Sequence, residues 1–358
     1  MKKYQKFIAK LYLKNFLIVY FALELFFIGM DLMQNLKYIS NSANLQILYT
    51  VNELLYYTSY TLPLSLIFAM MLTIFNILKS NELVSMYSLG ISKDQLIRPI
   101  MLISTFLTLF YIALNFIPDF INADEKAKNI RKYNNPYQTT SSLFLKSNNT
   151  YAYIDKLFPD RKEGKNLKIF ITKKNRLVEI LEAKNAVFKN NSWQLKDVKS
   201  IQIPNLENNK DDAKLVFSTF KTKEVLHGFQ PKIIDTLFKS LSKLTIQDSF
   251  TAINLLNKQN LNSDKIKSNL YTMIFFPLFA PIVIYALFFP LPMQRRGANL
   301  SLIISASIFI ILSIWGVLFT LSKMSVNGAI KPELAIVVPV LLLAFVASII
   351  ARKYRVMI

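Results

Sequence analysis

The stretch from Leu54 to Leu78 has the sequence LLYYTSYTLPLSLIFAMMLTIFNIL and contains no charged residue. An α-helix rises about 1.5 Å per residue and needs roughly 20 apolar residues to cross the hydrocarbon core of a bilayer. This stretch is therefore expected to span a membrane. Five other stretches meet or nearly meet that length, so that the predicted spans lie near 15–34, 55–78, 99–117, 269–289, 299–322 and 334–351. Pro63, Pro277 and Pro281 are expected to kink or weaken the spans that contain them.

The composition also favours a membrane protein and excludes several classes of enzyme. Of the 358 residues, 53% are hydrophobic, which is more than in an ordinary soluble domain. The chain has no cysteine and a single histidine, His227, which excludes disulfides, thiolate metal sites and cysteine nucleophiles. It also lacks the glycine-rich motifs that bind nucleotide phosphates. We therefore expect no catalytic residue, metal site or cofactor in this chain.

The distribution of basic residues predicts the orientation. A net charge of +21 would also suit a nucleic-acid-binding protein, but Lys and Arg collect in the cytoplasmic loops of membrane proteins, and no nucleic acid is expected as a partner. With the N-terminus in the cytoplasm, the inner segments contain 13 basic residues and the outer loops contain 3, namely Lys37, Lys323 and Lys331. Both termini are therefore predicted to be cytoplasmic. The inner basic residues are Lys2, Lys3, Lys6, Lys10, Lys14, Lys79, Lys93, Arg98, Arg295, Arg296, Arg352, Lys353 and Arg355.

The first predicted span carries two acidic residues, Glu24 and Asp31. They are seven residues apart, so a helix places them within about 20° of one face. A carboxylate that faces lipid costs roughly 2.5–3.5 kcal/mol at mid-bilayer, so this face is expected to contact protein or water. An interhelical contact is the simpler interpretation for Glu24, whereas the position of Asp31 near the outer interface favours a functional role. The basic N-terminal flank resembles a signal peptide, but no cleavage site follows before Asn35, and we expect this helix to be retained.

A long insert, residues 118–268, separates the first three spans (1–117) from the last three (269–358). It carries 27 basic and 16 acidic residues and is expected to lie outside the cytoplasm. Alternating apolar and polar residues predict strands at 167–172, 192–198 and 215–220. Paired asparagines predict turns at 148–149, 190–191 and 208–209, and residues 233–267 have helical periodicity. The expected fold is a polytopic α-helical membrane protein with six spans, three plus three, and an inserted extracytoplasmic antiparallel β domain, either a sandwich or an open barrel.

A short helix is predicted near 81–89, in the loop between the second and third spans. Ser80 or Asn81 can cap it, and Glu82 lies in its first turn, where the helix dipole favours an acidic residue. Gly90 can take the left-handed conformation that ends a helix, and Ser92 can cap the third span. Two interpretations remain open. The helix is either a connector on the lipid headgroups or a coupling helix that docks into a cytoplasmic partner.

The same loop carries the most informative motif. Its sequence, NELVSMYSLGIS at 81–92, is followed by LIRP at 96–99. This pattern resembles the signature SEL-x-AL-x-A-x-G-x-S … L-x-R-P of the LptF/LptG permeases, also called YjgP/YjgQ permeases. Further similarity to the family lies at 116–119 (FIPD), 182–186 (EAKNA), 193–198 (WQLKDV), 295–297 (RRG) and 331–339 (KPELAIVVP). No single motif is decisive, but their order and the three-plus-three layout are together specific.

The resemblance implies a permease subunit of an ABC transporter in the bacterial inner membrane, not an enzyme. Such subunits form an LptF/LptG heterodimer, extract lipopolysaccharide, and pass it through periplasmic β-jellyroll domains towards LptC and the bridge to the outer membrane. ATP with Mg is used by a separate cytoplasmic LptB ATPase dimer. The first and fifth helices form lateral gates, and membrane lipids surround the complex. The residues implied to couple to the ATPase are Asn81, Glu82, Leu83, Met86, Tyr87 and Gly90.

Within the family, Gly29–Asp31 resembles the acidic position of the LptG subunit, so we favour LptG over LptF. Well-known members carry a basic residue about one turn before that acid, where this chain has Phe27, Ile28 and Met30. Contacts between that basic group and lipid phosphates are therefore not transferred to this chain. Lys37 could replace it, or could be a helix-end residue that extends towards headgroups. The substrate or gate candidates are Glu24, Asp31 and Lys37.

Two other classes of function are weighed against this one. An intramembrane transferase would need clustered acids, bases or metal ligands near the outer leaflet, where only Asp31, Glu53 and tyrosines are present. A membrane scaffold with a periplasmic binding domain would not associate with an ATPase. Co-purification with an LptB-like ATPase therefore separates the exporter from the scaffold.

Overall fold

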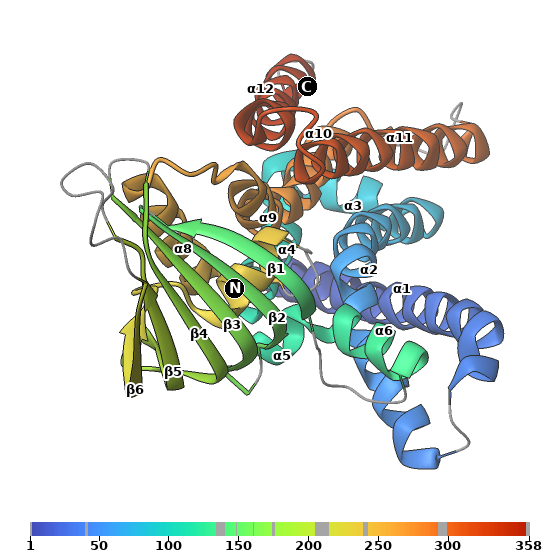
Figure 1. Ribbon diagram of the computed structural model, residues 1–358. Helices are drawn as coiled ribbons and strands as arrows, with labels where there is room; N and C mark the ends of the chain where they lie inside the picture. The colour runs from blue at the N-terminus through green and yellow to red at the C-terminus, as the bar shows by residue number, and fades with distance from the viewer. Residues whose placement is uncertain are drawn as a thin grey trace. The chain divides into compact units, whose positions relative to one another are not determined.

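A computed structural model describes residues 2–39, 42–133, 140–147, 149–159, 161–173, 176–204, 215–238, 243–292 and 299–355. The chain forms two compact units. The helical unit consists of Met1–Asp124 and Lys267–Ile358, and the sheet unit consists of Glu125–Ile266. Figure 1 shows the order of the elements by colour, from blue α1 to red α12. Each unit is described separately below.

The helical unit contains six helices that are long and apolar enough to cross a membrane, which confirms the six predicted spans. Most of them extend beyond the apolar stretch, because helices continue through polar residues at their ends. Thus α2 begins at Ala43, whereas its apolar stretch begins near residue 55. The spanning elements are α1 (Lys3–Asn35), α2 (Ala43–Lys79), α4 (Lys93–Leu114), α9 (Asp264–Ile274) with η2 (Phe276–Leu278) and α10 (Phe279–Phe288), α11 (Leu300–Val326), and η3 (Glu333–Val337) with α12 (Val338–Arg355).

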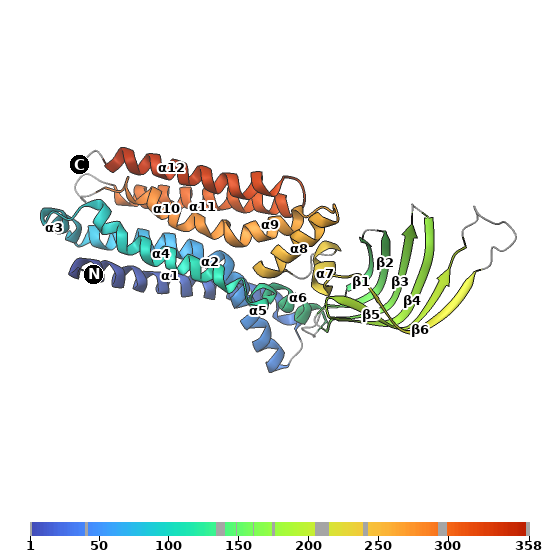
Figure 2. The same ribbon diagram turned by 90° about the vertical axis from the view of Figure 1, so that its left-hand side faces the viewer.

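The spanning helices lie side by side, and the two chain ends lie at the same end of the helical unit as α3 (Glu82–Ser88) (Figure 2). This arrangement follows from an even number of spans. The remaining short helices of this unit are η1 (Leu36–Tyr38) and α5 (Pro118–Ile121), whereas most of α6 (Ala123–Tyr133) belongs to the sheet unit.

The prolines in the spans have different effects on the helices. Pro277 lies in η2, a short 3₁₀ segment that separates α9 from α10 in the fourth span. Proline lacks an N–H group and its ring clashes with the preceding turn, which explains the interruption. In contrast, Pro63 lies inside the continuous helix α2. Only the fourth span is therefore divided at a predicted proline.

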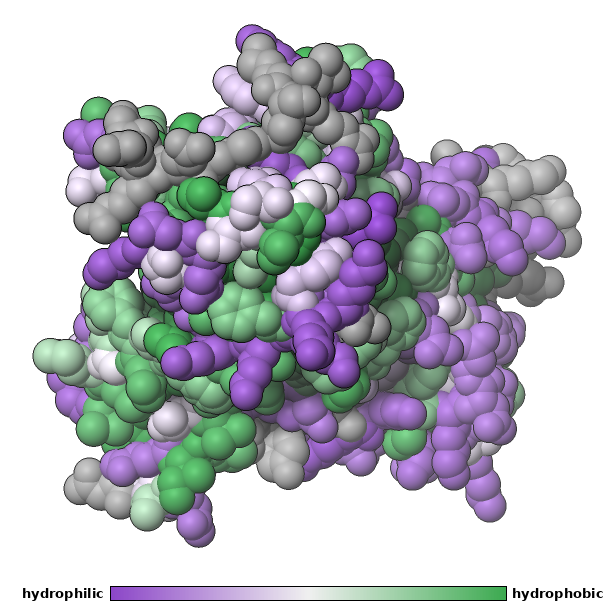
Figure 3. Space-filling view, turned by 180° about the vertical axis from the view of Figure 1, so that it is seen from behind, coloured by the Kyte–Doolittle hydropathy of each residue, from purple (hydrophilic) through white to green (hydrophobic). Residues whose placement is uncertain are grey.

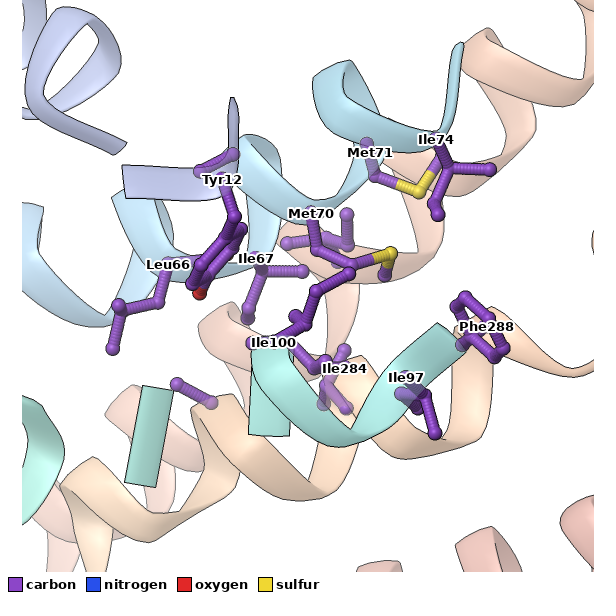
Figure 4. Close-up of a cluster of buried hydrophobic side chains, with 14 of the residues drawn as sticks. Tyr12, Leu66, Ile67, Met70, Met71, Ile74, Ile97, Ile100, Ile284 and Phe288 are labelled. Carbon is purple, nitrogen blue, oxygen red and sulfur yellow. The ribbon is translucent and has the colours of Figure 1, made fainter. Parts of the chain in front are cut away.

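The core of the helical unit lies where α1, α2, α4 and α10 meet (Figure 4). Met70, Ile100 and Ile284 come from three of these helices and are fully buried. A polar side chain joins α1, the remaining one of these four helices, to this core. Tyr12 of α1 donates a hydrogen bond to the backbone oxygen of Leu66 on α2 (3.1 Å). Because buried donors need acceptors, this contact specifies how α1 packs on α2.

The sheet unit contains a six-stranded antiparallel sheet in which every strand pairs with its neighbours in chain order, which confirms the antiparallel β prediction. Of the predicted turns, Asn190 and Asn191 have positive φ angles of 47° and 61° between β4 and β5. Asn148, Asn208 and Asn209 lie outside the described residues. The strands are β1 (Thr140–Ser147), β2 (Thr150–Phe158), β3 (Glu163–Lys173), β4 (Arg176–Lys189), β5 (Ser192–Gln202) and β6 (Val216–Val225).

Helical segments after the sheet cover one of its faces. The helices α7 (Pro231–Phe238) and α8 (Ile246–Lys258) confirm the predicted helical periodicity of this region. Ile234 of α7 is buried in the same cluster as the inward side chains of the sheet. The indole N–H of Trp193 donates to the backbone oxygen of Phe229 (2.8 Å), just before α7. The segment therefore completes the core of the sheet unit as well as leading back to the spans.

Candidate functional site

The loop between α2 and α4 contains the short helix that the sequence predicts, α3. Asn81 precedes it with a left-handed φ of 58°, although its side chain makes no capping hydrogen bond. Gly90 ends it with φ 76° and donates its N–H to the oxygen of Tyr87 (2.9 Å). The hydroxyl of Ser92 then accepts a hydrogen bond from the N–H of Gln95 (3.4 Å) and caps α4. The left-handed glycine and the serine cap are confirmed.

One side of α3 packs against the helical unit. Leu83 is buried, with 4% of its surface exposed. Met86 and Tyr87 are half-buried against the core of the unit, and burial raises the pKa of Tyr87 to about 12. Three of the implied coupling residues thus anchor α3 to the spanning helices. These three side chains fix the position of α3 on the helical unit. Contacts between α3 and a partner protein therefore have to come from its other side chains.

Apart from Asn81, the outward side of α3 consists of residues that the sequence reasoning did not select. Leu89 is 78% exposed and Val84 is 40% exposed, and Ser85 and Ser88 lie on the same side. Glu82 is half-buried at the start of the helix. Residues 81, 84, 85, 88 and 89 have the spacing of one helical face. This spacing could have identified the outward side from the sequence. The outward side is defined here as Asn81, Val84, Ser85, Ser88 and Leu89.

Lys93 connects α4 to the end of α10. Its ammonium group donates to the backbone oxygen of Phe289 (2.8 Å), directly after α10, and only 9% of the residue is exposed. A cation at this position satisfies a carbonyl that the helix leaves unpaired and interacts favourably with the helix dipole. The sequence analysis counted Lys93 only as a cytoplasmic basic residue. Arg295, Arg296 and Gly297, which follow α10, lie outside the described residues.

A second candidate region lies between α1 and the first half of α2. Glu24 is 3% exposed, and its Oε1 accepts hydrogen bonds from the hydroxyls of Thr58 (3.2 Å) and Thr61 (2.5 Å). This confirms the expectation that its face of α1 contacts protein. Each hydroxyl also lies within hydrogen-bond distance of a backbone oxygen one turn earlier in α2. Because a hydroxyl has a single proton, the carboxylate and that backbone oxygen are alternative acceptors.

Asp31 lies on the same side of α1, nearer its end. It accepts hydrogen bonds from the amide of Asn35 (2.8 Å), the hydroxyl of Tyr57 (3.4 Å) and the hydroxyl of Tyr49. Tyr49 and Tyr57 both come from α2, and neither was selected from the sequence. No described contact joins Asp31 to Lys37, which is exposed and lies 4.9 Å from the centroid of the Tyr38 ring. Glu24 and Asp31 therefore belong to one row of polar contacts between α1 and α2, here called the polar seam. Lys37 lies outside it.

The spanning helices differ strongly in burial. Within its most apolar window, α2 has 78% of its residues buried, whereas α1 and α11 have 17% each. Large apolar side chains on α1 are exposed, including Phe21, Leu25 and Met33. In the space-filling view, hydrophobic residues gather at the lower left, on the side where α1 lies (Figure 3). The first and fifth spans thus have the lowest buried share of the six candidate spans, although α1 packs along α2 on one side.

In the part of the chain that the structure describes, no group of three or more His, Asp or Glu side chains is arranged to hold a metal ion. Comparison with protein families gives a match to the model of the lipopolysaccharide export system permease LptF/LptG over residues 6–353. No curated protein matches the chain.

Proposed function

Because the chain belongs to the lipopolysaccharide export system permease LptF/LptG family, we propose that it is one of the two permease subunits of a lipopolysaccharide exporter and occupies the LptG position. We place it in the bacterial inner membrane, with both termini cytoplasmic and the sheet unit periplasmic. In this role it pairs with an LptF-like permease, binds an LptB-like ATPase dimer, and delivers lipopolysaccharide to an LptC-like protein.

The observation that carries the proposal is the low burial of α1 and α11. Their apolar windows are 17% buried, against 78% for α2, although all three helices belong to one unit. In a bilayer, such helices contact lipid or another membrane protein. A permease that receives a lipid substrate between two subunits needs spans of this kind. The low burial therefore supports α1 and α11 as the helices that meet the second permease and the substrate.

The anchored helix α3 supports coupling to an ATPase. The chain contains no nucleotide-binding motif, so energy for transport has to come from a partner. Leu83, Met86 and Tyr87 hold α3 on the helical unit, while Leu89 and Val84 are exposed beside it. A rigidly held helix with exposed apolar residues can transmit movement of a bound partner to α2 and α4. We propose that its outward side and Glu82 contact the ATPase.

Co-purification tests this coupling. The chain is expressed with an LptF-like permease and an LptB-like ATPase, and the ATPase retained after purification is measured. Leu89→Glu and Glu82→Lys are expected to remove most of the ATPase. The first places a charge in an apolar contact, and the second reverses a charge whose loss from a buried pair typically costs about 2–5 kcal/mol. Lys79→Glu, an exposed change at the same end of the unit, serves as the control. Full retention of ATPase by both α3 variants would rule out the coupling role.

Lipid crosslinking tests the substrate assignment. An amphiphile with phosphates needs cations near the headgroup level. Lys37 is exposed in η1, directly after α1 and six residues after Asp31. Lys37→Glu is expected to weaken lipopolysaccharide crosslinking more than it weakens assembly of the complex. Lys331→Glu, in the exposed loop between α11 and η3, is the matched control. Equal crosslinking in wild type and Lys37→Glu would leave Lys37 as an interfacial anchor only.

A further inference from the structure

A long apolar groove lies between α10, α11 and α12. Its volume is about 470 Å³, and its lining includes Pro290, Leu302, Ile310, Ile314, Leu343 and Ile350. Ser307 is the one polar side chain in the lining that the structure describes. The groove belongs entirely to the helical unit and involves neither α3 nor the seam of Glu24 and Asp31.

The packing of the helices explains why this groove exists. Helix α10 packs along α12, whereas α11 approaches η3 and α2 and lies further from the backbones of α10 and α12. Among the residues that the structure describes, no side chain fills the space between α11 and the other two helices. Leu302 and Ile310 on α11 are 63% and 44% exposed at its edge.

The length of the groove matches one leaflet of a bilayer. On α11 it extends from Leu302 to Ile314, which corresponds to about 18 Å of helix. The hydrocarbon core is about 30 Å thick, so one leaflet contributes about half of it. The groove begins near the ends of α10 and α12 and the start of α11, at the same end of the unit as the chain termini (Figure 2). An acyl chain that descends from this headgroup level would fill it.

A basic residue lies just beyond the lining of the groove at that end. Leu343, Val346, Ala347 and Ile350 line it and share one face of α12. Lys353 follows Ile350 by three residues on the same face, about 4.5 Å closer to the end of the helix, and is exposed. Arg352 is also exposed, but at two residues beyond Ile350 it lies on the other side of α12. Within the described residues of α12, Lys353 is thus the basic side chain that follows the apolar lining on the same face.

From these features we propose that the groove binds one acyl chain of an anionic glycerophospholipid in the leaflet nearest the chain ends, with its phosphate on Lys353. The groove and its adjacent charge do not depend on the proposed transport function, and only the exclusion of lipopolysaccharide as the occupant rests on it. Asp31 near the end of α1, and Lys37 in η1 directly after it, lie at the end of the first span opposite the N-terminus. Lipopolysaccharide is therefore not the expected occupant, and the bound lipid is a resident one.

The acyl chain is tested by photocrosslinking the full chain, with the partners that co-purify with it. The complex is placed in nanodiscs of phosphatidylcholine with a trace of phosphatidylglycerol that carries a photoactivatable acyl chain. Label is expected in the peptides that contain 302–314 and 343–350. Ala306→Phe fills the groove from an exposed lining position and should remove most of this label. Ser305→Phe, the neighbouring exposed residue outside the lining, should leave it unchanged.

The headgroup contact is tested by a matched pair on α12. Lys353→Glu is expected to lower labelling by phosphatidylglycerol about fivefold, while Arg352→Glu has a much smaller effect. This pair keeps the test valid if Ala306→Phe disturbs packing. Equal effects within either pair would overturn the proposal, because the groove would then contain only bulk lipid. Competition by lipopolysaccharide but not by unlabelled phosphatidylglycerol would overturn it as well.

Discussion

Lys93 is the residue whose role changes most between sequence and structure. In the sequence it is one of several basic residues that indicate a cytoplasmic loop. In the structure its ammonium group is the donor to the oxygen of Phe289, so it connects the beginning of α4 to the end of α10. The serine cap at Ser92 and this contact together determine where α4 starts after the turn at Gly90.

Replacement of Lys93 by methionine tests this contact. The methionine retains an apolar stem but leaves the oxygen of Phe289 without its donor. Because hydrogen bonds to charged groups contribute about 1.5–3 kcal/mol, Lys93→Met is expected to lower the free energy of unfolding by that amount. The measurement is thermal unfolding of the full chain in detergent. Arg98→Met, an exposed change on the same helix, should have little effect, and equal losses in both variants would contradict the role of Lys93.

Glu179 provides a pH-dependent contact in the sheet unit. Partial burial raises the pKa of its carboxyl, but hydrogen bonds from Lys223 (2.6 Å) and Ser200 (2.6 Å) outweigh this effect, so that the pKa is lowered overall. A folded-state pKa below the unfolded value of about 4.3 stabilises the fold above that pH. The stabilisation is lost as the pH falls through the lowered folded-state pKa.

Hydrogen exchange of the full chain tests this linkage. Protection of the amides of β4 and β6 is expected to decrease as the pH falls below about 4.3, after correction for intrinsic exchange. Glu179→Gln should reduce protection at neutral pH and remove most of this additional pH dependence. Glu182→Gln, whose partner Lys168 lies in an exposed ion pair, is the control. An unchanged pH profile in Glu179→Gln would show that the contact is not coupled to the stability of the sheet.

At the scale of elements, the turn after α3 depends on one backbone conformation. Gly90 has φ 76°, and a Cβ atom added there would meet nothing within 4 Å. Space is therefore not the constraint, and a substitution is opposed by the left-handed conformation itself. Asparagine tolerates this conformation better than β-branched residues do.

Gly90→Val is accordingly expected to misplace α3 and to lower both ATPase retention and lipid release, whereas Gly90→Asn should keep most of both. The strain of a non-glycine residue in this region is about 1–2 kcal/mol. The measurement is transport by the purified complex together with protease cleavage near residue 90. If both variants transport as wild type does, the turn is not a determinant of coupling.

At the scale of the whole molecule, topology is the testable property. The basic residues place 118–268 outside the cytoplasm, and Lys162 lies in an exposed turn between β2 and β3. A reporter inserted after Lys162 should therefore be active only in the periplasm, while one fused after the C-terminus should be active only in the cytoplasm. Insertion at this turn should preserve the sheet, since exposed turns tolerate insertions. Cytoplasmic activity at Lys162 would contradict the orientation.

The candidate site was only partly predictable. The short helix near 81–89, the glycine at its end and the acidic face of α1 follow from local rules of capping and helical periodicity. The partners of Glu24 and Asp31 did not, because Thr58, Thr61, Tyr49 and Tyr57 lie on another helix. Periodicity shows that one face of α1 must be covered, but it does not show which side chains cover it.

The sequence by itself determined the six spans, the inserted antiparallel strands and the family, because long apolar runs, alternating residues and ordered motifs are local patterns. The tertiary structure decided which side of α3 is exposed, where the ammonium group of Lys93 lies, and that α11 separates from α10 and α12 to leave a groove. These features depend on contacts between residues far apart in the chain. Such contacts arise when whole helices pack against one another, and no local pattern in the sequence contains that information.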